Sequence, residues 1–263
     1  MCRDCGCSLG PSAARAPFAA QTAAPKAARG RGHVESIEVI TAILDANDRV
    51  AAHNRAHFDA QGVLAVNLMS SPGSGKTSLL EATIRALQGE LKVAVIEGDL
   101  ATENDAARIR ACGVPAVQIT TGNACHLDAQ MVHDALHELP LAGLDVLFVE
   151  NVGNLVCPAS FDLGTHRNVT LLSVTEGDDK PAKYPVMFRA GDLTLISKVD
   201  LLPHLEDFSV ERVRRSLREV GFAGGILEVS KRGGDGLAAW LGWLRGELAS
   251  RRGRLNPSGG ERS

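Results

Sequence analysis

The sequence predicts an α/β protein built on a largely parallel, seven-stranded sheet with helices on both faces. Two observations predict this fold. Short apolar segments alternate with helical patterns along most of the chain, and a Ser- and Gly-rich loop ending in Lys-Thr joins the first apolar segment to the helical pattern after it. Continuous apolar strands are typical of parallel sheets covered on both faces. Ligands of such sheets bind beyond the carboxyl ends of the strands.

Seven segments have the length and apolar composition of buried strands. They are residues 63–69, 92–97, 116–120, 145–150, 169–175, 192–197 and 225–230. Helical patterns separate or follow them at residues 76–87, 102–112, 127–138, 181–190, 209–220 and 236–249. Apolar residues at mostly helical spacing between residues 34 and 60 predict one or two amphipathic helices ahead of the first strand. We interpret these leading helices as packing elements.

The amino-acid composition excludes several classes of protein. Of 263 residues, 44% are hydrophobic but only 4% aromatic, so the core must be mainly aliphatic. The chain has 28 Lys and Arg against 31 Asp and Glu, and this near balance argues against a nucleic-acid binder that is basic throughout and against an acidic disordered chain. No run approaches the roughly 20 apolar residues of a membrane span, so we expect no membrane insertion. The length favours one domain of roughly 200 residues with tails.

The two ends of the chain are basic. Residues 1–33 hold five basic residues against one acidic, and residues 250–263 hold four against one. We expect a disordered Ala/Pro/Arg-rich linker at 8–33 and a disordered basic tail at 250–263, with leading helices at 34–61 and the main domain at 62–249. A transit peptide is the alternative for the start, but it would discard the cysteines there. Without an apolar signal segment we expect a cytoplasmic protein, in which thiols stay reduced.

Residues 70–77 read S-S-P-G-S-G-K-T, the pattern of a phosphate-binding loop (P-loop). Its glycines let backbone N–H groups face a polyphosphate, Lys76 can reach the β and γ oxygens, and Thr77 can hold Mg²⁺. Ser70 stands where the strict pattern has glycine. An ordinary Gly-rich turn between strand and helix is the alternative. The nucleotide contacts expected here are Gly73, Ser74, Gly75, Lys76, Thr77 and Ser78.

Two of the predicted strands near this loop end in an acidic residue. Glu150 ends a buried strand and can bind Mg²⁺ directly or through water, and Gly153 can approach a γ-phosphate. Asp99 is a second candidate ligand of Mg²⁺ or water, with helix capping as the alternative. The sequence shows no evident general base and no evident arginine finger. Catalysis of hydrolysis must therefore depend on positioning of the reactants and on stabilisation of charge, and we expect slow turnover. The expected catalytic set is Lys76, Thr77, Asp99 and Glu150.

A segment S-K-V-D that begins at Ser197 can select guanine. The Asp200 carboxylate can accept hydrogen bonds from guanine N1–H and N2–H₂, which favours GTP over ATP, and the Lys198 stem can stack on the base. The familiar form has asparagine where Ser197 stands, so guanine preference rests mainly on Asp200, and ordinary capping by the serine stays open. Ser230 and Lys231, at the end of the last strand, could close over the base.

Three cysteines crowd into the first seven residues. Cys2, Cys5 and Cys7 place three thiolates where they could enclose Ni²⁺ or Zn²⁺. Incidental cysteines on a tail are the alternative. The spacing alone does not name the metal.

A second metal site would combine residues that follow two different strands. Cys125 and His126 come after the third strand and Cys157 after the fourth, so all three should lie on the nucleotide side of the sheet. Three ligands leave one tetrahedral position open for water or a second subunit. Taken singly, each residue is more often a buried thiol or a satisfied histidine, which is the role that we assign to the thiol of Cys112.

Together these motifs resemble the HypB family, the nickel-inserting GTPases of [NiFe]-hydrogenase maturation. The resemblance covers the first seven residues and about residues 34–249. The motifs are C-x-x-C-G-C, S-S-P-G-S-G-K-T, E-G-D-L-A-T-x-x-D-A-x-R-I-R, T-G-N-A-C-H-L-D, E-N-V-G-N-L-V-C-P and S-K-V-D-L-L-P. The resemblance implies that the main domain is the GTPase domain of a P-loop NTPase and that Asp200 contacts guanine.

The resemblance also implies metal sites and partners. The three N-terminal cysteines would form the tight nickel site, and Cys125, His126 and Cys157 a second site for zinc or nickel near a dimer interface. The family is expected to dimerise with GTP and to work with HypA, a small zinc-containing accessory protein that passes nickel to the hydrogenase large subunit. Many relatives carry a histidine-rich nickel-storage stretch after the cysteines. Residues 8–32 contain no histidine, so we do not expect bulk nickel storage.

Three rival functions stay open from the sequence. One is a related metallochaperone GTPase that serves urease or a cobalamin enzyme. Another is a metal-buffering protein with a vestigial nucleotide site, which the serines at positions 70 and 197 would suit. The third is an ATP-dependent kinase of small molecules.

Overall fold

The computed structural model describes residues 32–100, 103–231 and 234–255. The chain divides into two compact units, Met1–Val39 and Ile40–Ser263. Residues 8–31 of the expected linker and the three N-terminal cysteines lie outside the described residues. Within the described ranges, no helix is long and apolar enough to cross a membrane.

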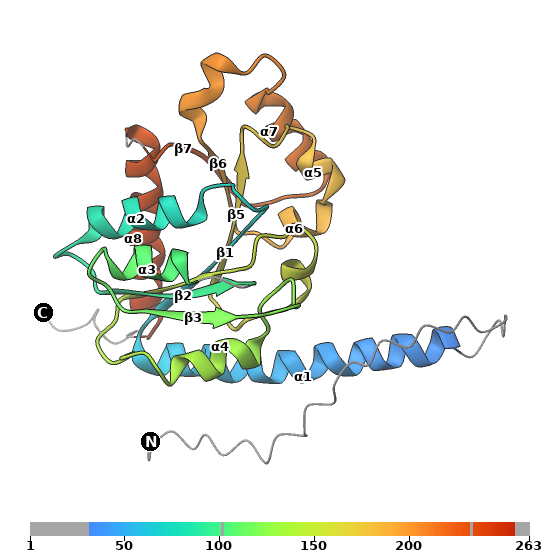
Figure 1. Ribbon diagram of the computed structural model, residues 1–263, viewed down its shortest axis with the longest axis vertical. Helices are drawn as coiled ribbons and strands as arrows, with labels where there is room; N and C mark the ends of the chain where they lie inside the picture. Colours follow the sequence, from blue (N-terminus) through green and yellow to red (C-terminus); the bar gives the residue numbers. More distant parts are fainter. Residues whose placement is uncertain (1–31, 101–102, 232–233, 256–263) are drawn as a thin grey trace, which may run out of the picture. The chain divides into compact units, whose positions relative to one another are not determined.

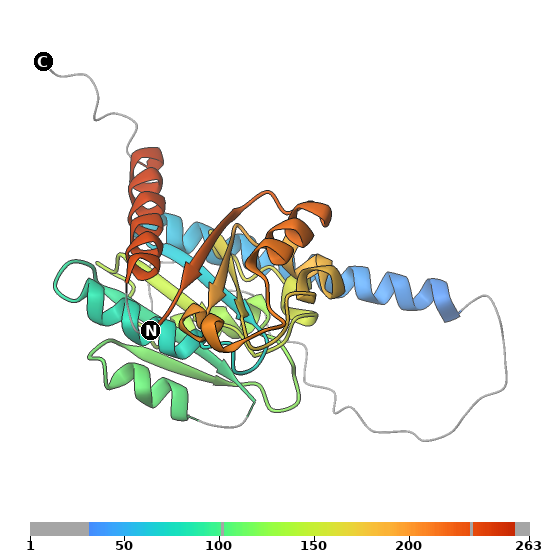
Figure 2. The same cartoon turned by 90° about the horizontal axis from the view of Figure 1, so that it is seen from above.

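Seven parallel strands form one sheet in the order β3-β2-β4-β1-β5-β6-β7 (Figure 1). Seen from above, the strand direction changes steadily across the sheet, which is the twist of a parallel sheet (Figure 2). The strands are β1 (Leu64–Ser70), β2 (Val93–Asp99), β3 (Ala116–Thr120), β4 (Val146–Glu150), β5 (Arg167–Ser173), β6 (Leu193–Ser197) and β7 (Gly225–Val229). The central strands β1 and β4 are buried along their whole length. The predicted fold class is confirmed.

The helices follow the predicted ones in order, and one of the predicted helices is divided in two. They are α1 (Gly32–Gln61), α2 (Lys76–Leu87), α3 (Asn104–Arg110), α4 (Ala129–Leu136), α5 (Lys180–Lys183), α6 (Pro185–Arg189), α7 (Val210–Glu219) and α8 (Asp235–Leu255), with 3₁₀ turns η1 (Cys157–Ser160) and η2 (Val199–His204). The leading segment is one continuous helix. The helix expected at 181–190 is divided in two, because Pro185 forces the preceding Tyr184 out of helical geometry, to φ −127° and ψ 54°.

Helices cover the sheet on both faces. One face of β1 packs through Leu64, Val66 and Leu68 into a cluster with α2 and α8. The opposite face packs through Ala65 into a cluster with α4 and with Phe58 of α1. Beyond β1 the same face is covered by α6 and α7. The two faces of one strand thus pack against different helices, which produces a three-layered domain.

The basic C-terminal segment departs from expectation. Helix α8 continues to Leu255, so the expected start of a disordered tail at residue 250 is wrong for residues 250–255. The cause is Arg251, whose side chain is only 4% exposed. Its Nε donates to the Val63 carbonyl at 3.0 Å, and its guanidinium pairs with the Asp59 carboxylate. Residues 256–263 lie outside the described residues.

His166 lies on the chain just before β5 and is largely buried beneath Arg251. Its Nδ1 accepts a hydrogen bond from the backbone N–H of Ala65 at 2.9 Å. Burial, followed by the positive charge of Arg251, lowers the pKa of His166 to about 4 from the ordinary 6.5. The folded protein therefore holds this imidazole neutral at pH values where the unfolded chain would protonate it.

We expect His166 to make the protein less stable in mild acid. Because its folded pKa is depressed, the contribution is fully present above pH 6.5 and is lost as the pH falls toward about 4. Between pH 7.5 and pH 5 the loss should be about 2 kcal/mol, at 1.36 kcal/mol per pKa unit. His166→Asn keeps an acceptor near Nδ1 without the titration. Urea unfolding of the metal-free protein at both pH values should give a drop about 2 kcal/mol smaller in the variant, and equal drops would contradict the assignment.

Candidate functional site

A cavity of about 670 Å³ opens at the carboxyl edge of the sheet. The P-loop forms its floor, and the ends of β2, β4, β6 and β7 form its walls. Most of the residues that the sequence predicts for the nucleotide line it. They are Gly73, Ser74, Gly75, Lys76, Thr77, Ser78, Asp99, Glu150, Gly153, Lys198, Asp200 and Lys231. The structure therefore brings together segments from four strands that are far apart in the sequence.

The P-loop turns sharply from β1 into α2. Gly73 and Gly75 have φ values of 75° and 97°, in the left-handed region that glycine adopts without strain. Helix α2 begins directly afterwards at Lys76, so its N-terminal backbone N–H groups face the cavity. This arrangement suits an anion such as a polyphosphate.

Ser70 and Ser197, which depart from the familiar motifs, both make specific hydrogen bonds. The Lys76 ammonium, only 7% exposed, donates to Ser70 Oγ at 3.0 Å. Ser197 Oγ donates to the Ser74 carbonyl at 2.7 Å, which ties the end of β6 to the P-loop. The neighbouring Lys198 adds a second tie by donating from Nζ to the Gly73 carbonyl at 2.7 Å.

The far end of the cavity contains the residues predicted for the base. Ser230 Oγ donates to Asp200 Oδ1 at 2.7 Å, so Ser230 holds the carboxylate of Asp200 from the side of β7. Lys231 lines the same end of the cavity. The predicted guanine contacts of β6 and β7 are thus neighbours in space.

Two buried carboxylates face each other beside the P-loop. Glu97 of β2 and Glu150 of β4 are register partners, exposed by 2% and 3%. Thr77 Oγ1 donates to Glu150 Oε1 at 2.8 Å, whereas Oε2 of each glutamate has no hydrogen-bond partner among the described residues. Burial, and then the nearby Glu150, raise the pKa of Glu97 to about 11, and burial also raises the pKa of Glu150. Unpartnered carboxylate oxygens beside a threonine hydroxyl are a donor set that fits Mg²⁺.

Glu97 and Arg108 were not anticipated as cavity residues. Glu97 is a charged residue in a mainly apolar strand, two residues before Asp99. Because side chains alternate between the two faces of a strand, Glu97 and Asp99 must lie on the same face, and this spacing could have identified Glu97 as a cavity residue. Arg108 of α3 also lines the cavity. Its guanidinium is held by Glu81 at 3.0 Å and by Asp105 at 2.7 Å.

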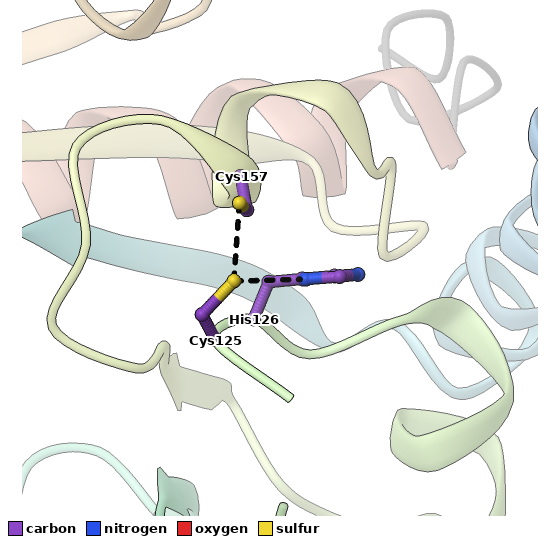
Figure 3. A group of neighbouring side chains, drawn as sticks. All are labelled: Cys125, His126 and Cys157. Atoms are coloured by element: carbon purple, nitrogen blue, oxygen red, sulfur yellow. Dashed lines mark hydrogen bonds between the residues drawn. The ribbon is translucent and has the colours of Figure 1, made fainter. Parts of the chain in front are cut away.

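Cys125, His126 and Cys157 lie close together on the chain segments that follow β3 and β4 (Figure 3). The Cys125 thiol donates to Cys157 Sγ at 3.1 Å and lies 3.9 Å from His126 Nδ1. All the ligand atoms lie within 4.8 Å of one another. The thiols are free, and the hydrogen bond from Cys125, followed by burial, raises the pKa of Cys157. Thiolate and imidazole ligands in this number suit Zn²⁺ or Ni²⁺. The three residues that the sequence predicts as ligands of the second metal site are therefore close together in the structure.

A single segment, residues 151–157, joins this trio to the P-loop. The backbone N–H of Asn154 donates to the Ser70 carbonyl at 2.8 Å, and its side-chain Nδ2 donates to the Cys125 carbonyl at 3.2 Å. Gly153 lies directly against Pro72 of the P-loop. Cys157 ends the segment. Cys112, by contrast, packs against the core cluster beneath α2, as assigned.

Comparisons with known proteins agree with this geometry. Residues 64–222 match the family model described as "CobW/HypB/UreG, nucleotide-binding domain". The chain is 54% identical over 217 residues to the hydrogenase maturation factor HypB of Escherichia coli K12, a match that covers 82% of this chain and 74% of the relative.

Two solved structures are similar over most of the domain. The crystal structure of HypB from Helicobacter pylori in complex with nickel matches with a TM-score of 0.75 and 41% identity, over 78% of this chain and 96% of that one. The hydrogenase maturation factor HypB from Archaeoglobus fulgidus matches with a TM-score of 0.73 and 40% identity, over 78% and 100%.

We expect Gly153→Ala to weaken nucleotide binding. A Cβ at this position would lie 2.8 Å from Pro72 Cα, and because that atom is backbone the P-loop must shift. Affinity for a fluorescent GTP analogue should fall about tenfold or more, which corresponds to about 1.4 kcal/mol. Gly246→Ala in α8 is the matched control, since its Cβ would meet nothing within 4 Å. Unchanged affinity in Gly153→Ala would show that the P-loop does not depend on this contact.

Proposed function

Because the chain belongs to the HypB family of hydrogenase maturation factors, we propose that it hydrolyses GTP and helps to insert nickel into the large subunit of a [NiFe]-hydrogenase. One observation carries the proposal. Residues 151–157 contact the P-loop on one side and include or contact two of the three grouped metal ligands on the other. A change at the phosphate can therefore be transmitted to the metal through one short segment.

The nucleotide would lie along the P-loop with its base toward Asp200. Lys76 would exchange its bond to Ser70 Oγ for a phosphate oxygen. The Asp200 carboxylate, held by Ser230, would accept from guanine N1–H and N2–H₂. The ties of Ser197 and Lys198 to the P-loop keep the base and phosphate halves of the site at a fixed separation.

Thr77 and Glu150 would hold Mg²⁺, with Asp99 and Glu97 nearby. When bound, Mg²⁺ neutralises charge that develops on the β- and γ-phosphate oxygens. The chain's own contribution is to orient the phosphates along the P-loop and to supply the positive charge of Lys76. No general base is assigned, so we infer that hydrolysis is slow.

Nickel handling would use two sites. Cys2, Cys5 and Cys7 would hold nickel at the start of the chain, and Cys125, His126 and Cys157 would take zinc or nickel, with the fourth position left to water or to a second subunit. The partners that we propose are a GTP-dependent homodimer, a HypA-type accessory protein and the hydrogenase large-subunit precursor, all in the cytoplasm. Hydrolysis would relax residues 151–157 and change the second site's affinity for metal or for a partner.

We expect Lys76→Ala to abolish release of phosphate from GTP, because it removes the buried ammonium that is placed to contact the phosphate oxygens. The unmodified protein should turn over more slowly than roughly 1 s⁻¹, below the usual kinase range. Gly246→Ala should match the unmodified protein. Equal phosphate release by Lys76→Ala would instead favour a metal buffer with a vestigial nucleotide site.

Asp200→Ala should remove the preference for GTP over ATP, because the guanine N1–H and N2–H₂ donors lose their acceptor. Competition of each nucleotide against a fluorescent GTP analogue measures this preference. A preference for ATP in the unmodified chain would overturn the assignment and favour the kinase.

Nickel titration of the full chain tests whether the three N-terminal cysteines bind nickel. Replacing Cys2, Cys5 and Cys7 by Ala should remove one tightly bound Ni²⁺ per chain, with or without a GTP analogue. Cys112→Ala is the control and should keep the full stoichiometry, because its thiol packs against the core. An identical nickel stoichiometry in the triple variant and the unmodified chain would refute the N-terminal site.

A further inference from the structure

Four of the eight histidines gather between α1 and α4, away from the cavity and the cysteines. His53 and His57 lie four residues apart on α1, and His133 and His137 lie four residues apart at the end of α4. A spacing of four residues places both members of each pair on one side of their helix. The two helices lie alongside each other (Figure 1), fixed by the Asn54 side chain, which donates from Nδ2 to the Ala129 carbonyl at 2.8 Å.

The imidazoles are close neighbours. The ring centroids of His53 and His133 are 5.2 Å apart, and those of His133 and His137 are 5.1 Å apart. His57 lies one helical turn after His53 on α1, on the same side of that helix. Each helix thus contributes a pair of imidazoles to one junction.

Asn54 determines which nitrogen of His133 can bind an ion. Asn54 is fully buried, and its Nδ2 donates to two carbonyls, those of Ala129 at 2.8 Å and Leu163 at 3.2 Å. Its Oδ1 must therefore be the acceptor in the 3.1 Å contact with His133 Nδ1. The proton of neutral His133 is then on Nδ1, and the lone pair is on Nε2. Outer hydrogen bonds of this kind orient the histidine ligands of metals.

The charge state of the cluster also suits a ligand role. Burial is the largest cause that lowers the pKa values of His57 and His133, and the neighbouring histidines lower them further. Burial thus favours the neutral form of the imidazole, which is the form that binds a metal ion. The buried Nδ1 of His57 has no hydrogen-bond partner among the described residues. His137 is exposed, so an ion can reach the cluster from solvent.

We propose that His53, His57, His133 and His137 form a histidine-only site for a divalent transition-metal ion of the Ni²⁺ and Zn²⁺ class, distinct from both cysteine sites. Imidazole nitrogen is a preferred ligand of these ions. Within the described part of the chain, only the Cys125 group has three ligand atoms within 4.8 Å of one another, so an ion could be held by the histidines only if their rings moved closer together. Rotation of the exposed His137 and the half-buried His53 about their side-chain bonds would supply that movement. The C-terminal end of α4 adds favourable negative potential for a cation.

The test uses the full, tag-free chain with Cys2, Cys5, Cys7, Cys125 and Cys157 replaced by Ala. This thiol-depleted chain should bind one Ni²⁺ or Zn²⁺ in calorimetric titration, and X-ray absorption of the bound ion should show imidazole nitrogen and no sulfur. Adding His53→Gln and His137→Gln should weaken binding about tenfold or more, about 1.4 kcal/mol. Both positions are partly or fully exposed, so folding is retained.

A matched control separates this site from general histidine binding. His204→Gln, at the exposed end of η2, should leave the affinity of the thiol-depleted chain unchanged. The proposal is overturned if the thiol-depleted chain binds neither ion, or if its ion is held equally well after the change of His53 and His137. Because the nucleotide site and the cysteines play no part in this measurement, its failure would leave the proposed function standing.

Discussion

The organisation of this protein depends on the confinement of residues 151–157 between two loops. The segment leaves the fully buried strand β4, so its starting point cannot move without disturbing the sheet. Gly153 touches the P-loop, and Asn154 is hydrogen-bonded to Ser70 on one side and to the loop of Cys125 on the other. A segment fixed at its start and in contact with two loops is placed to transmit a displacement of one loop to the other, as the proposed function requires.

The same edge of the sheet brings together buried ionisable side chains. Glu97 and Glu150 are buried side by side, with Lys76 and Thr77 as their polar neighbours. Burial of carboxylates is unfavourable without compensating partners. An apolar pair at these register positions would satisfy the core better, so the two glutamates are explained by the ligand that the cavity binds and not by folding.

The sequence predicts the sheet well because its strands are buried on both faces and appear as apolar runs. The bounds of α2 agree at both ends, since the P-loop fixes its first residue. The sequence also identified about half of the residues that line the cavity, because the motifs that contain them are local. It missed Glu97, which appears in sequence as one polar residue in a strand, and Arg251, whose burial depends on Val63 and Asp59 far earlier in the chain.

The serines at positions 70 and 197 appear in the sequence only as departures from the familiar motifs, and their role becomes clear once their hydrogen-bond partners on the P-loop are known. The histidine cluster joins α1 to α4 through residues that are 79 positions apart, Asn54 and His133, and no local pattern predicts that contact.

The burial of α8 against the first strand also determines when the domain can form during synthesis. Trp240 packs in the same cluster as β1 and donates from Nε1 to Thr83 Oγ1 at 2.9 Å. Arg251 reaches the residue that precedes β1. One face of the central strand β1 can therefore pack against α2 but not against α8 until residues 240–251 have been made, and the apolar surface that α8 covers stays exposed during translation. Folding of the domain is accordingly a late event, completed only after nearly all of its sequence has been made.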